Sequence, residues 1–289
     1  TKLEIPMDLE KAKASHYNTD RITAVCQELE FHSISERLEV IDQRFGKVPH
    51  KDSQQLILFA DEGKTKESPV IPTPSTGEIS FVIINTLDAL NALVKELSSA
   101  KLIAFDTETT STDQMSANLV GISLAINENQ GYYIPVGHDN GQQLELSVVL
   151  NALNTPLRDL NIPKAGHNIK YDFVILARHG LIVQPLSFDS MLAEWITNPS
   201  SQSLGLKKLA WVRLGHNMTE IEKLIGKGKD QITMAAVSIE DAAAYAADDA
   251  VVVIRLMPSL KAEMESKASL DLFNELEMPL VRVLAEMEM

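Results

Sequence analysis

Two carboxylates separated by one residue follow a short apolar run in the first half of the chain. Asp106 and Glu108 come directly after Leu-Ile-Ala-Phe at residues 102–105, and side chains two apart on a strand point to the same face. Such charges repel each other unless a cation lies between them, and their oxygens suit a hard divalent ion such as Mg²⁺ or Mn²⁺. Alternatively, the strand simply leaves the core through an acidic loop. The pair alone does not decide between these two interpretations.

A third carboxylate, Asp249, occupies a position where an unpaired charge is costly. The helix that begins near Ser238 has an apolar stripe in steps of four and three residues, and Asp249 falls on that stripe. A buried carboxylate needs a cation, a hydrogen-bond network or a cavity. The adjacent Asp248 lies about 100° farther round the helix, on its polar side. The sequence therefore distinguishes Asp249 from Asp248.

Two further residues could join these carboxylates. Tyr245 stands one helical turn before Asp249, although it could instead be an aromatic side chain packed against the neighbouring alanines. Asp172 lies in the first turn of a helix that begins near Asn168, where the favoured alternative is a charge stabilised by the helix dipole. Taken together, the four carboxylates come from one strand and two helices, which is typical of a two-metal phosphodiester site.

The elements that must position these residues follow from hydrophobic periodicity and helix-start signals. The sequence predicts strands at residues 79–84, 102–105, 119–126 and 132–136. It predicts helices that begin at Thr86 and Ser238, and others at residues 144–153, 168–179, 189–197 and 204–214. These elements predict an α/β fold, in which a mixed sheet packs against helices.

The chain is predicted to consist of several segments. Residues 61–77 are rich in proline, glycine, serine and threonine, which is typical of a linker. We expect two or three short helices in residues 1–60 and the main domain in residues 78–268. The last residues, 269–289, continue an apolar helical pattern, so we interpret the chain as a piece of a longer protein.

Composition limits the possible partners. The formal net charge of −14 argues against an overall basic nucleic-acid or membrane binder, and no apolar run approaches the length of a membrane span. The single cysteine, Cys26, cannot form an internal disulfide, which favours a reducing compartment such as the cytoplasm.

Residues 201–230 form a local basic region with a net charge of +3, where we expect substrate phosphates to be contacted. Its glycine-flanked lysines, Lys227 and Lys229, are candidates for phosphate contact. For Lys207 and Lys208, a solvated helical face is an equally favoured interpretation.

Three spaced motifs resemble those of DEDD-type 3′→5′ exonucleases. They are Asp-Thr-Glu-Thr at 106–109, Gly-His-Asn-Ile-Lys-Tyr-Asp at 166–172 and Tyr-Ala-Ala-Asp-Asp at 245–249. The tyrosine of the last motif is that of the tyrosine subclass.

The flanking segments narrow this resemblance to the bacterial family A DNA polymerases. Residues 116–121 and 226–229 are similar to the proofreading domain of that family. Residues 275–281 are similar to the entry into its polymerase domain, and residues 1–60 resemble the tail of its 5′ nuclease region.

The resemblance implies a ribonuclease H-like fold and a site for two divalent ions, Mg²⁺ or Mn²⁺. It implies that Asp106 is a ligand of both ions, that Glu108 and Asp249 are further ligands, and that Asp172 acts on the second ion directly or through water. Tyr245 would then orient the attacking water.

The resemblance also implies substrate contacts. Asn168 would position the substrate or a ligand carboxylate. The family often places an apolar residue, commonly leucine, after the first motif to pack against the terminal base, whereas this chain has Thr112 there and Met115 nearby.

Three functions are consistent with these motifs. The first is a proofreading exonuclease that hydrolyses single-stranded DNA from its 3′ end and releases nucleoside monophosphates, next to the polymerase domain of the same parent chain, in the cytoplasm and on nucleoid DNA. The second is a non-catalytic module that binds single strands, which would be expected to have lost ligands, whereas this chain keeps all four. The third is a DEDD exoribonuclease, which shares the chemistry but not the flanking segments.

Overall fold

The computed structural model describes residues 77–201 and 204–289, together with single residues at positions 22, 23, 25, 26, 31, 34, 37 and 38. The chain divides into two units, residues 1–71 and residues 72–289. In the first unit, all the described residues except Phe31 are helical. The rest of the segment in which short helices are expected lies outside the described residues. The predicted linker, apart from Gly77, lies outside the described residues.

The second unit is built on one mixed six-stranded sheet with the order β1-β4-β3-β2-β5-β6. Five strands run in the same direction, and β3 runs opposite to them. Every residue of β3 is buried, which places the core around the middle of the sheet. The strands are β1 Ser80–Ile83, β2 Ile103–Thr109, β3 Leu119–Ala125, β4 Gln130–Pro135, β5 Lys164–Gly166 and β6 Leu186–Asp189.

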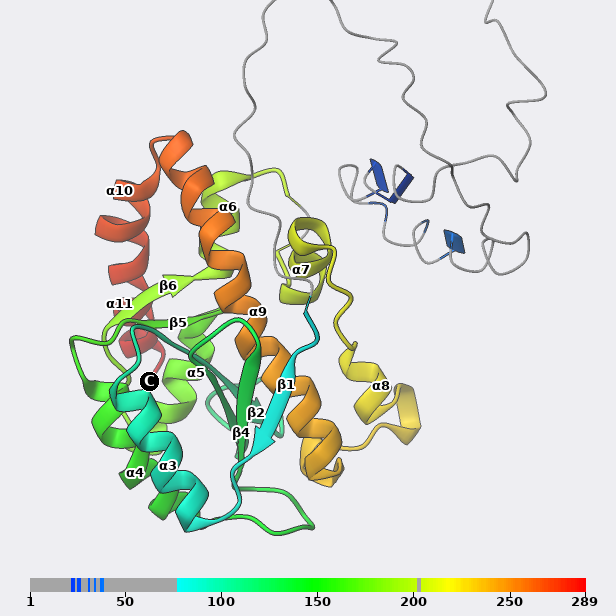
Figure 1. Ribbon diagram of the computed structural model, residues 1–289, viewed down its shortest axis with the longest axis vertical. Coiled ribbons are helices and arrows are strands. Elements are labelled where there is room, and N and C mark those ends of the chain that lie inside the picture. Colours follow the sequence, from blue (N-terminus) through cyan, green and yellow to red (C-terminus); the bar gives the residue numbers. More distant parts are fainter. Residues whose placement is uncertain are drawn as a thin grey trace, which may run out of the picture. The chain divides into compact units, whose positions relative to one another are not determined.

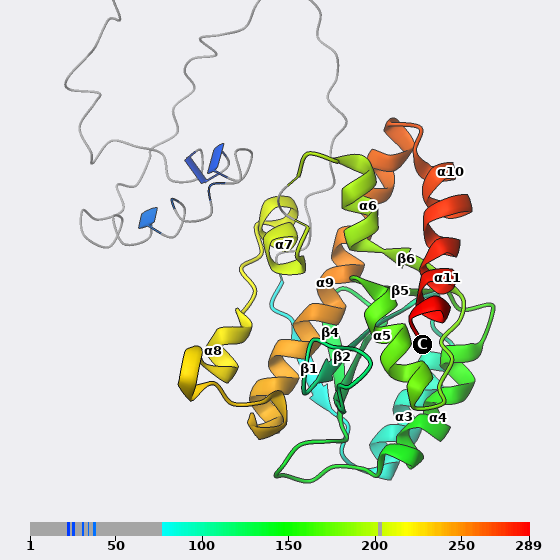
Figure 2. The ribbon, with the colours of Figure 1, turned by 180° about the vertical axis from the view of Figure 1, so that it is seen from behind.

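Helices pack around this sheet (Figures 1 and 2). In both views, α7 and α8 lie on one side of α9, and α10 and α11 lie on the other. The helices are α3 Leu87–Ser98, α4 Leu146–Arg158, α5 Ile169–Arg178, α6 Ser190–Thr197, α7 Leu206–Leu214, α8 Ile221–Ile225, α9 Ile239–Ser266, α10 Leu270–Leu272 and α11 Met278–Glu288. Shorter turns are η1 Gly228–Asp230, η2 Met234–Ala236 and the π-helical turn η3 Phe273–Glu277.

The long helix α9 lies across strands β1 to β4. Its alanine-rich first half allows a close approach to the sheet, because a Cβ atom added at Gly131 of β4 would lie only 2.6 Å from the Cβ of Ala247. Ser238 caps the start of α9, since its hydroxyl accepts a hydrogen bond from the backbone N–H of Asp241. This packing brings the first half of α9 against the centre of the sheet.

The sequence prediction missed two strands, β5 and β6. The three residues of β5 are all buried, so no alternation of polar and apolar residues marks the strand. Its first residue, Lys164, is fully buried because the Nζ atom donates to the carbonyl oxygens of Asp159, Ile162 and Gln184. Burial lowers the pKa of this ammonium to about 8. A lysine at this position therefore gave no indication of a strand.

Helix α4 also differs from the prediction, because it continues beyond residue 153 to Arg158 with Pro156 inside it. Pro156 lies near the end of the helix and is buried, so the hydrogen bond lost at its missing N–H costs less than it would in the middle of the helix. None of the helices in the described part of the chain has the length and apolarity needed to span a membrane.

Candidate active site

Strand β2 presents Asp106 and Glu108 from the middle of the sheet, between β3 and β5. Asp106 lies opposite Ser123 of β3, and Glu108 lies opposite Gly121. The regular pairing is interrupted directly after Glu108. The two carboxylates thus stand at the end of the regular part of a buried strand, on the same face, as the sequence predicts.

Helix α9 adds Asp249 to this pair. One carboxylate oxygen from each of Asp106, Glu108 and Asp249 can be chosen so that all lie within 4.8 Å of one another. We call these three residues the carboxylate group. Three oxygen donors at this spacing suit a hard divalent cation. Among the described acidic, histidine and cysteine residues, these three have side chains close enough together to share a metal ion.

The carboxylate group is electrostatically strained. Burial, followed by the charge of Asp249, raises the pKa of Glu108 to about 8. Burial also raises the pKa of Asp249 to about 6, although the positive charge of Lys207 opposes the increase. The pKa of Asp106 is raised well above its usual range by burial and by the charges of Asp172, Glu108 and Asp249. A bound cation would favour the ionised forms of all three.

Asp172 adjoins the carboxylate group but belongs to a different arrangement. It lies in the first turn of α5 and is only 2% exposed. Its Oδ1 atom accepts hydrogen bonds from the backbone N–H of Thr107 at 2.9 Å and from the Thr107 hydroxyl at 2.6 Å. Burial raises its pKa to about 7 despite these bonds. The interpretation of Asp172 as a charge held only by the helix dipole is therefore incomplete, because Thr107 binds it directly.

A buried acid that the sequence did not single out, Asp189, holds the start of α5. Its carboxylate accepts hydrogen bonds from the backbone N–H groups of Asn168 at 3.1 Å and Ile169 at 2.9 Å, and from those of Met191 and Leu192 in α6. Asn168 enters α5 in the left-handed conformation, with φ of 53°. Asp189 thereby fixes the helix end that carries Asn168 and Asp172.

Adjacent acids on α9 have different partners. Asp248 binds Nε2 of His216 at 2.8 Å, whereas Asp249 lies 3.3 Å from Nζ of Lys207. The same Nζ atom lies 3.9 Å from the ring centroid of Tyr245. The two acids therefore face different neighbours, in agreement with the predicted helix phase.

Lys207 and Lys208 also differ. The solvated interpretation is wrong for Lys207, whose side chain is only 18% exposed, while Lys208 is exposed. Tyr245, beneath the Lys207 ammonium, is buried, and burial with the charge of Asp249 raises the pKa of its hydroxyl. The Tyr245 hydroxyl is consequently neutral at physiological pH.

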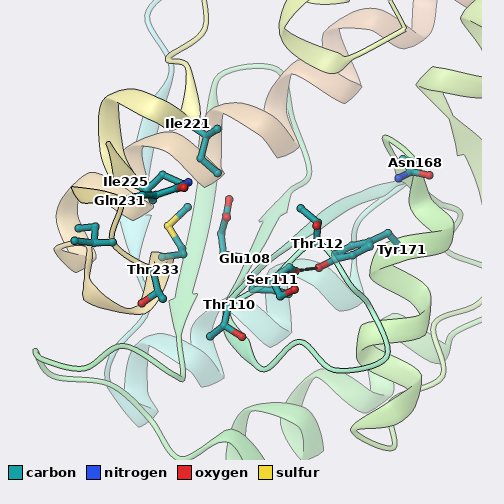
Figure 3. Close-up of a pocket in the computed structure, with 13 residues that line it drawn as sticks. Glu108, Thr110, Ser111, Thr112, Asn168, Tyr171, Ile221, Ile225, Gln231 and Thr233 are labelled. Atoms are coloured by element: carbon teal, nitrogen blue, oxygen red, sulfur yellow. Dashed lines mark hydrogen bonds between the residues drawn. The ribbon is translucent and has the colours of Figure 1, made fainter. Parts of the chain in front are cut away.

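A pocket of about 620 Å³ opens beside Glu108 (Figure 3). In Figure 3, side chains from α8 and the segment after it face those of Thr112, Tyr171 and Asn168 across the space. The Tyr171 hydroxyl is within 2.6 Å of both the Thr109 hydroxyl and the Ser111 carbonyl oxygen, which holds the loop after β2 to α5. The lining residues are Glu108, Thr109, Thr110, Ser111, Thr112, Asn168, Tyr171, Ile221, Ile225, Gln231, Ile232, Thr233 and Met234.

The remaining predicted substrate contacts lie outside this lining. Met115 is 41% exposed and does not line the pocket. Lys227 and Lys229 are exposed at the turn η1, between two lining segments, α8 and residues 231–234. The structure thus brings Thr112 and Asn168 to the pocket, whereas Met115, Lys227 and Lys229 are not among its lining residues.

The model of the 3′-5′ exonuclease family found in family A DNA polymerases matches residues 81–265. The chain belongs to this exonuclease family. DNA polymerase I of Chloroflexus aurantiacus is 36% identical over an alignment that covers 100% of this chain and 31% of the relative. DNA polymerase I of Pseudomonas aeruginosa is 31% identical over an alignment that covers 100% of this chain and 30% of the relative. The exonuclease chain spans about a third of the length of these relatives, and the resemblance drawn from its motifs is confirmed.

Solved structures agree in fold. Brucella melitensis NrnC aligns with a TM-score of 0.55 and 20% identity, over 73% of this chain and 93% of its own. Escherichia coli RNase D, an exoribonuclease, aligns with a TM-score of 0.55 and 21% identity, over 73% of this chain and 51% of its own. Pol1 of M. smegmatis aligns with a TM-score of 0.56 and 22% identity, over 71% of this chain and 31% of its own. The predicted ribonuclease H-like α/β fold is confirmed.

Proposed function

We propose that this exonuclease domain removes nucleotides one at a time from the 3′ end of single-stranded DNA and releases nucleoside monophosphates. The observation that carries the proposal is the convergence of Asp106, Glu108 and Asp249 within 4.8 Å, beside a pocket of about 620 Å³. The relatives named DNA polymerase I support a DNA substrate, because their similarity extends over the whole chain.

The donor set fits two divalent ions, Mg²⁺ or Mn²⁺. Asp106 would be a ligand of both ions, Glu108 and Asp249 would complete the carboxylate group, and Asp172 would act on the second ion directly or through water. Such ions lower the pKa of a water nucleophile and stabilise the leaving 3′ oxygen. Glu108 is buried and Asp106 and Asp249 are half-buried, and this low exposure strengthens their attraction for a cation.

The chain's own side chains orient the reactants. The neutral hydroxyl of Tyr245 would hold the attacking water, because it stands one turn from Asp249 on α9. The pocket would take the last nucleotide, with its base between the apolar side chains of Ile221 and Ile225 and the wall formed by Thr112. Asn168 at the rim would contact the substrate, and Lys227 and Lys229 would attract the phosphates that follow.

The alternatives have weaker support. An RNA substrate is suggested only by likeness to structures that are 20–21% identical, NrnC and RNase D. A binding module without catalysis would not need the convergence of three carboxylates, one buried and two half-buried, which raises their pKa values and costs folding free energy. Hydrolysis of DNA therefore accounts best for the site.

We further propose that α10 to α11 form the junction with a polymerase domain of the same parent chain. Exposed apolar side chains recur three or four residues apart from α10 through η3 to α11: Leu272, Leu276, Leu280, Val283 and Met287. Exposed apolar side chains gathered in this way are typical of a surface that another domain covers. On this proposal, the exonuclease domain comprises residues 78–268, residues 269–289 begin the polymerase domain, and residues 1–60 end a 5′ nuclease region.

The test is to incubate the chain with 5′-labelled single strands of DNA and of RNA with the same base sequence, in excess Mg²⁺ or in excess chelator. We expect stepwise shortening of the DNA from its 3′ end, with release of nucleoside monophosphates, only when Mg²⁺ is present. Asp106→Ala should abolish the reaction, and Tyr245→Phe should slow it by on the order of tenfold or more. Digestion that persists in chelator would refute the metal assignment, and faster digestion of RNA would refute the DNA assignment.

A further inference from the structure

The first turn of α7 places a lysine ammonium at the carboxylate group. Nζ of Lys207 lies 3.3 Å from Oδ1 of Asp249, and the two side chains are only 18% and 13% exposed. The same Nζ atom lies 3.9 Å from the centre of the Tyr245 ring. An ammonium at this distance from an aromatic ring is attracted by its negative face. Lys207 is thus held by two residues that both belong to α9.

The charge of Lys207 acts on the whole carboxylate group. It lowers the pKa of Asp249, of Glu108 and, more weakly than the other causes, of Asp106. Among the described residues, Lys207 is the cation whose charge lowers the pKa of all three carboxyls. Its ammonium therefore compensates part of the negative charge that the carboxylates bring into the core.

We propose that Lys207 is an internal counter-cation that competes with divalent ions for Asp249 and so sets the metal affinity of the site. The inference rests on the proposed function, because it takes the carboxylate group to be a metal site. A divalent ion and an ammonium repel each other when both lie close to one carboxylate oxygen. The divalent ion must therefore displace Lys207 from Asp249 before it can bind there. Lys207 is a positioning residue in this scheme, and it weakens metal binding while it stabilises the site against its own negative charge.

The first experiment measures Mn²⁺ affinity by calorimetric titration of the 289-residue chain and of three variants. In Lys207→Met, we expect the Kd for Mn²⁺ to fall by about tenfold, because removal of one unit charge a few ångströms away relieves a repulsion of this order even when water screens it. Lys207→Arg keeps the charge and should retain the wild-type Kd. Lys208→Met removes an equal charge from the next residue of α7, which is exposed, and should also leave the Kd unchanged.

The second experiment separates this role from a merely structural one by thermal melting. In chelator, Lys207→Met should melt at a lower temperature than the wild type, because the carboxylate group loses its counter-charge. In excess Mn²⁺ the difference should shrink, since tighter binding adds more stability to the variant. A lysine that only packs would instead lower the melting temperature equally in both conditions. If Lys207→Met does not fold in chelator, Lys207→Gln is titrated in its place.

The outcomes distinguish the inference from the function on which it rests. If the wild type binds Mn²⁺ and a folded Lys207→Met binds it no more tightly, the inference is overturned and the exonuclease proposal stands. If neither protein binds Mn²⁺, the metal site itself is overturned, and the inference with it. A lower Kd in Lys208→Met of the same size would show a general charge effect and would also overturn the specific role of Lys207.

Discussion

Thr107 donates two hydrogen bonds to one carboxylate oxygen of Asp172, through its backbone N–H at 2.9 Å and its hydroxyl at 2.6 Å. The backbone bond is possible because β5 pairs with β2 only at Ile103 and Ala104. The edge of β2 beyond these residues is free of sheet partners on that side, and Asp172 takes the place of a neighbouring strand. The short length of β5 is thus what allows α5 to bring a carboxylate to the end of β2.

This relationship predicts the effect of Thr107→Val. Valine has nearly the same shape, so the substitution removes the hydroxyl bond and keeps the backbone bond. We expect the exonuclease rate to fall by on the order of tenfold, because a hydrogen bond to a charged group contributes roughly 1.5–3 kcal/mol. Steady-state hydrolysis of labelled single-stranded DNA measures the loss. Thr197→Val is the matched control, since Thr197 is also buried but its hydroxyl donates to backbone carbonyl oxygens within α6, outside the pocket lining. An equal loss in both variants would mean that Asp172 needs no help from the Thr107 hydroxyl.

The neighbouring acids of α9 give a second prediction. Asp249→Ala should remove most of the activity, because it deletes a member of the carboxylate group. Asp248→Ala should retain substantial activity, since Asp248 faces His216. Rates at saturating Mg²⁺, with each variant's fold checked by circular dichroism, provide the measurement. Similar losses in the two variants would show that the helix phase assigned to these residues does not govern function.

The sequence was sufficient where a residue's position follows from local periodicity. Asp106 and Glu108 share a face because strand side chains alternate, and the steps of four and three residues along α9 separated Asp249 from Asp248. The sequence was insufficient where the partner is distant in the chain. Nothing near Lys207 indicates that it meets Asp249, which lies 42 residues away.

Long-range hydrogen bonds explain the other omissions. Asp189 caps the start of α6 and also binds the start of α5, about twenty residues earlier in the chain. Thr107 lies between two conspicuous acids, and its role depends on the early end of β5, a strand too short and too buried to show any period. Only the folded chain places these donors and acceptors together.

The domain boundary leads to a third prediction. The first described residue of the second unit is Gly77, whose carbonyl oxygen accepts a hydrogen bond from Nη2 of Arg255 at 2.9 Å, and Arg255 also donates to the carbonyl oxygen of Glu128. A chain that starts at Gly77 keeps both bonds. We expect it to fold and to hydrolyse single-stranded DNA at a rate close to that of the full chain. A shortened chain that is folded by circular dichroism but inactive would show that residues 1–76 contribute to the site.

The raised pKa values give a final prediction, on the coupling between pH, metal and stability. The carboxyls of Asp249, Asp172 and Glu108 have pKa values of about 6, 7 and 8 in the folded protein, above the unfolded values of about 4. Between these limits the folded state binds more protons than the unfolded state, so in chelator the free energy of unfolding falls as the pH rises. We expect the melting temperature in chelator to decrease from about pH 5 to about pH 8 by on the order of 5 °C.

Excess Mg²⁺ should stabilise the ionised carboxylates, so its effect on the melting temperature should be larger at about pH 8 than at about pH 5. Asp249→Ala should flatten both dependences, because it removes one raised carboxyl and one ligand. A melting temperature in chelator that rises over this pH range would mean that the carboxylate group is ionised and compensated in the folded protein without metal.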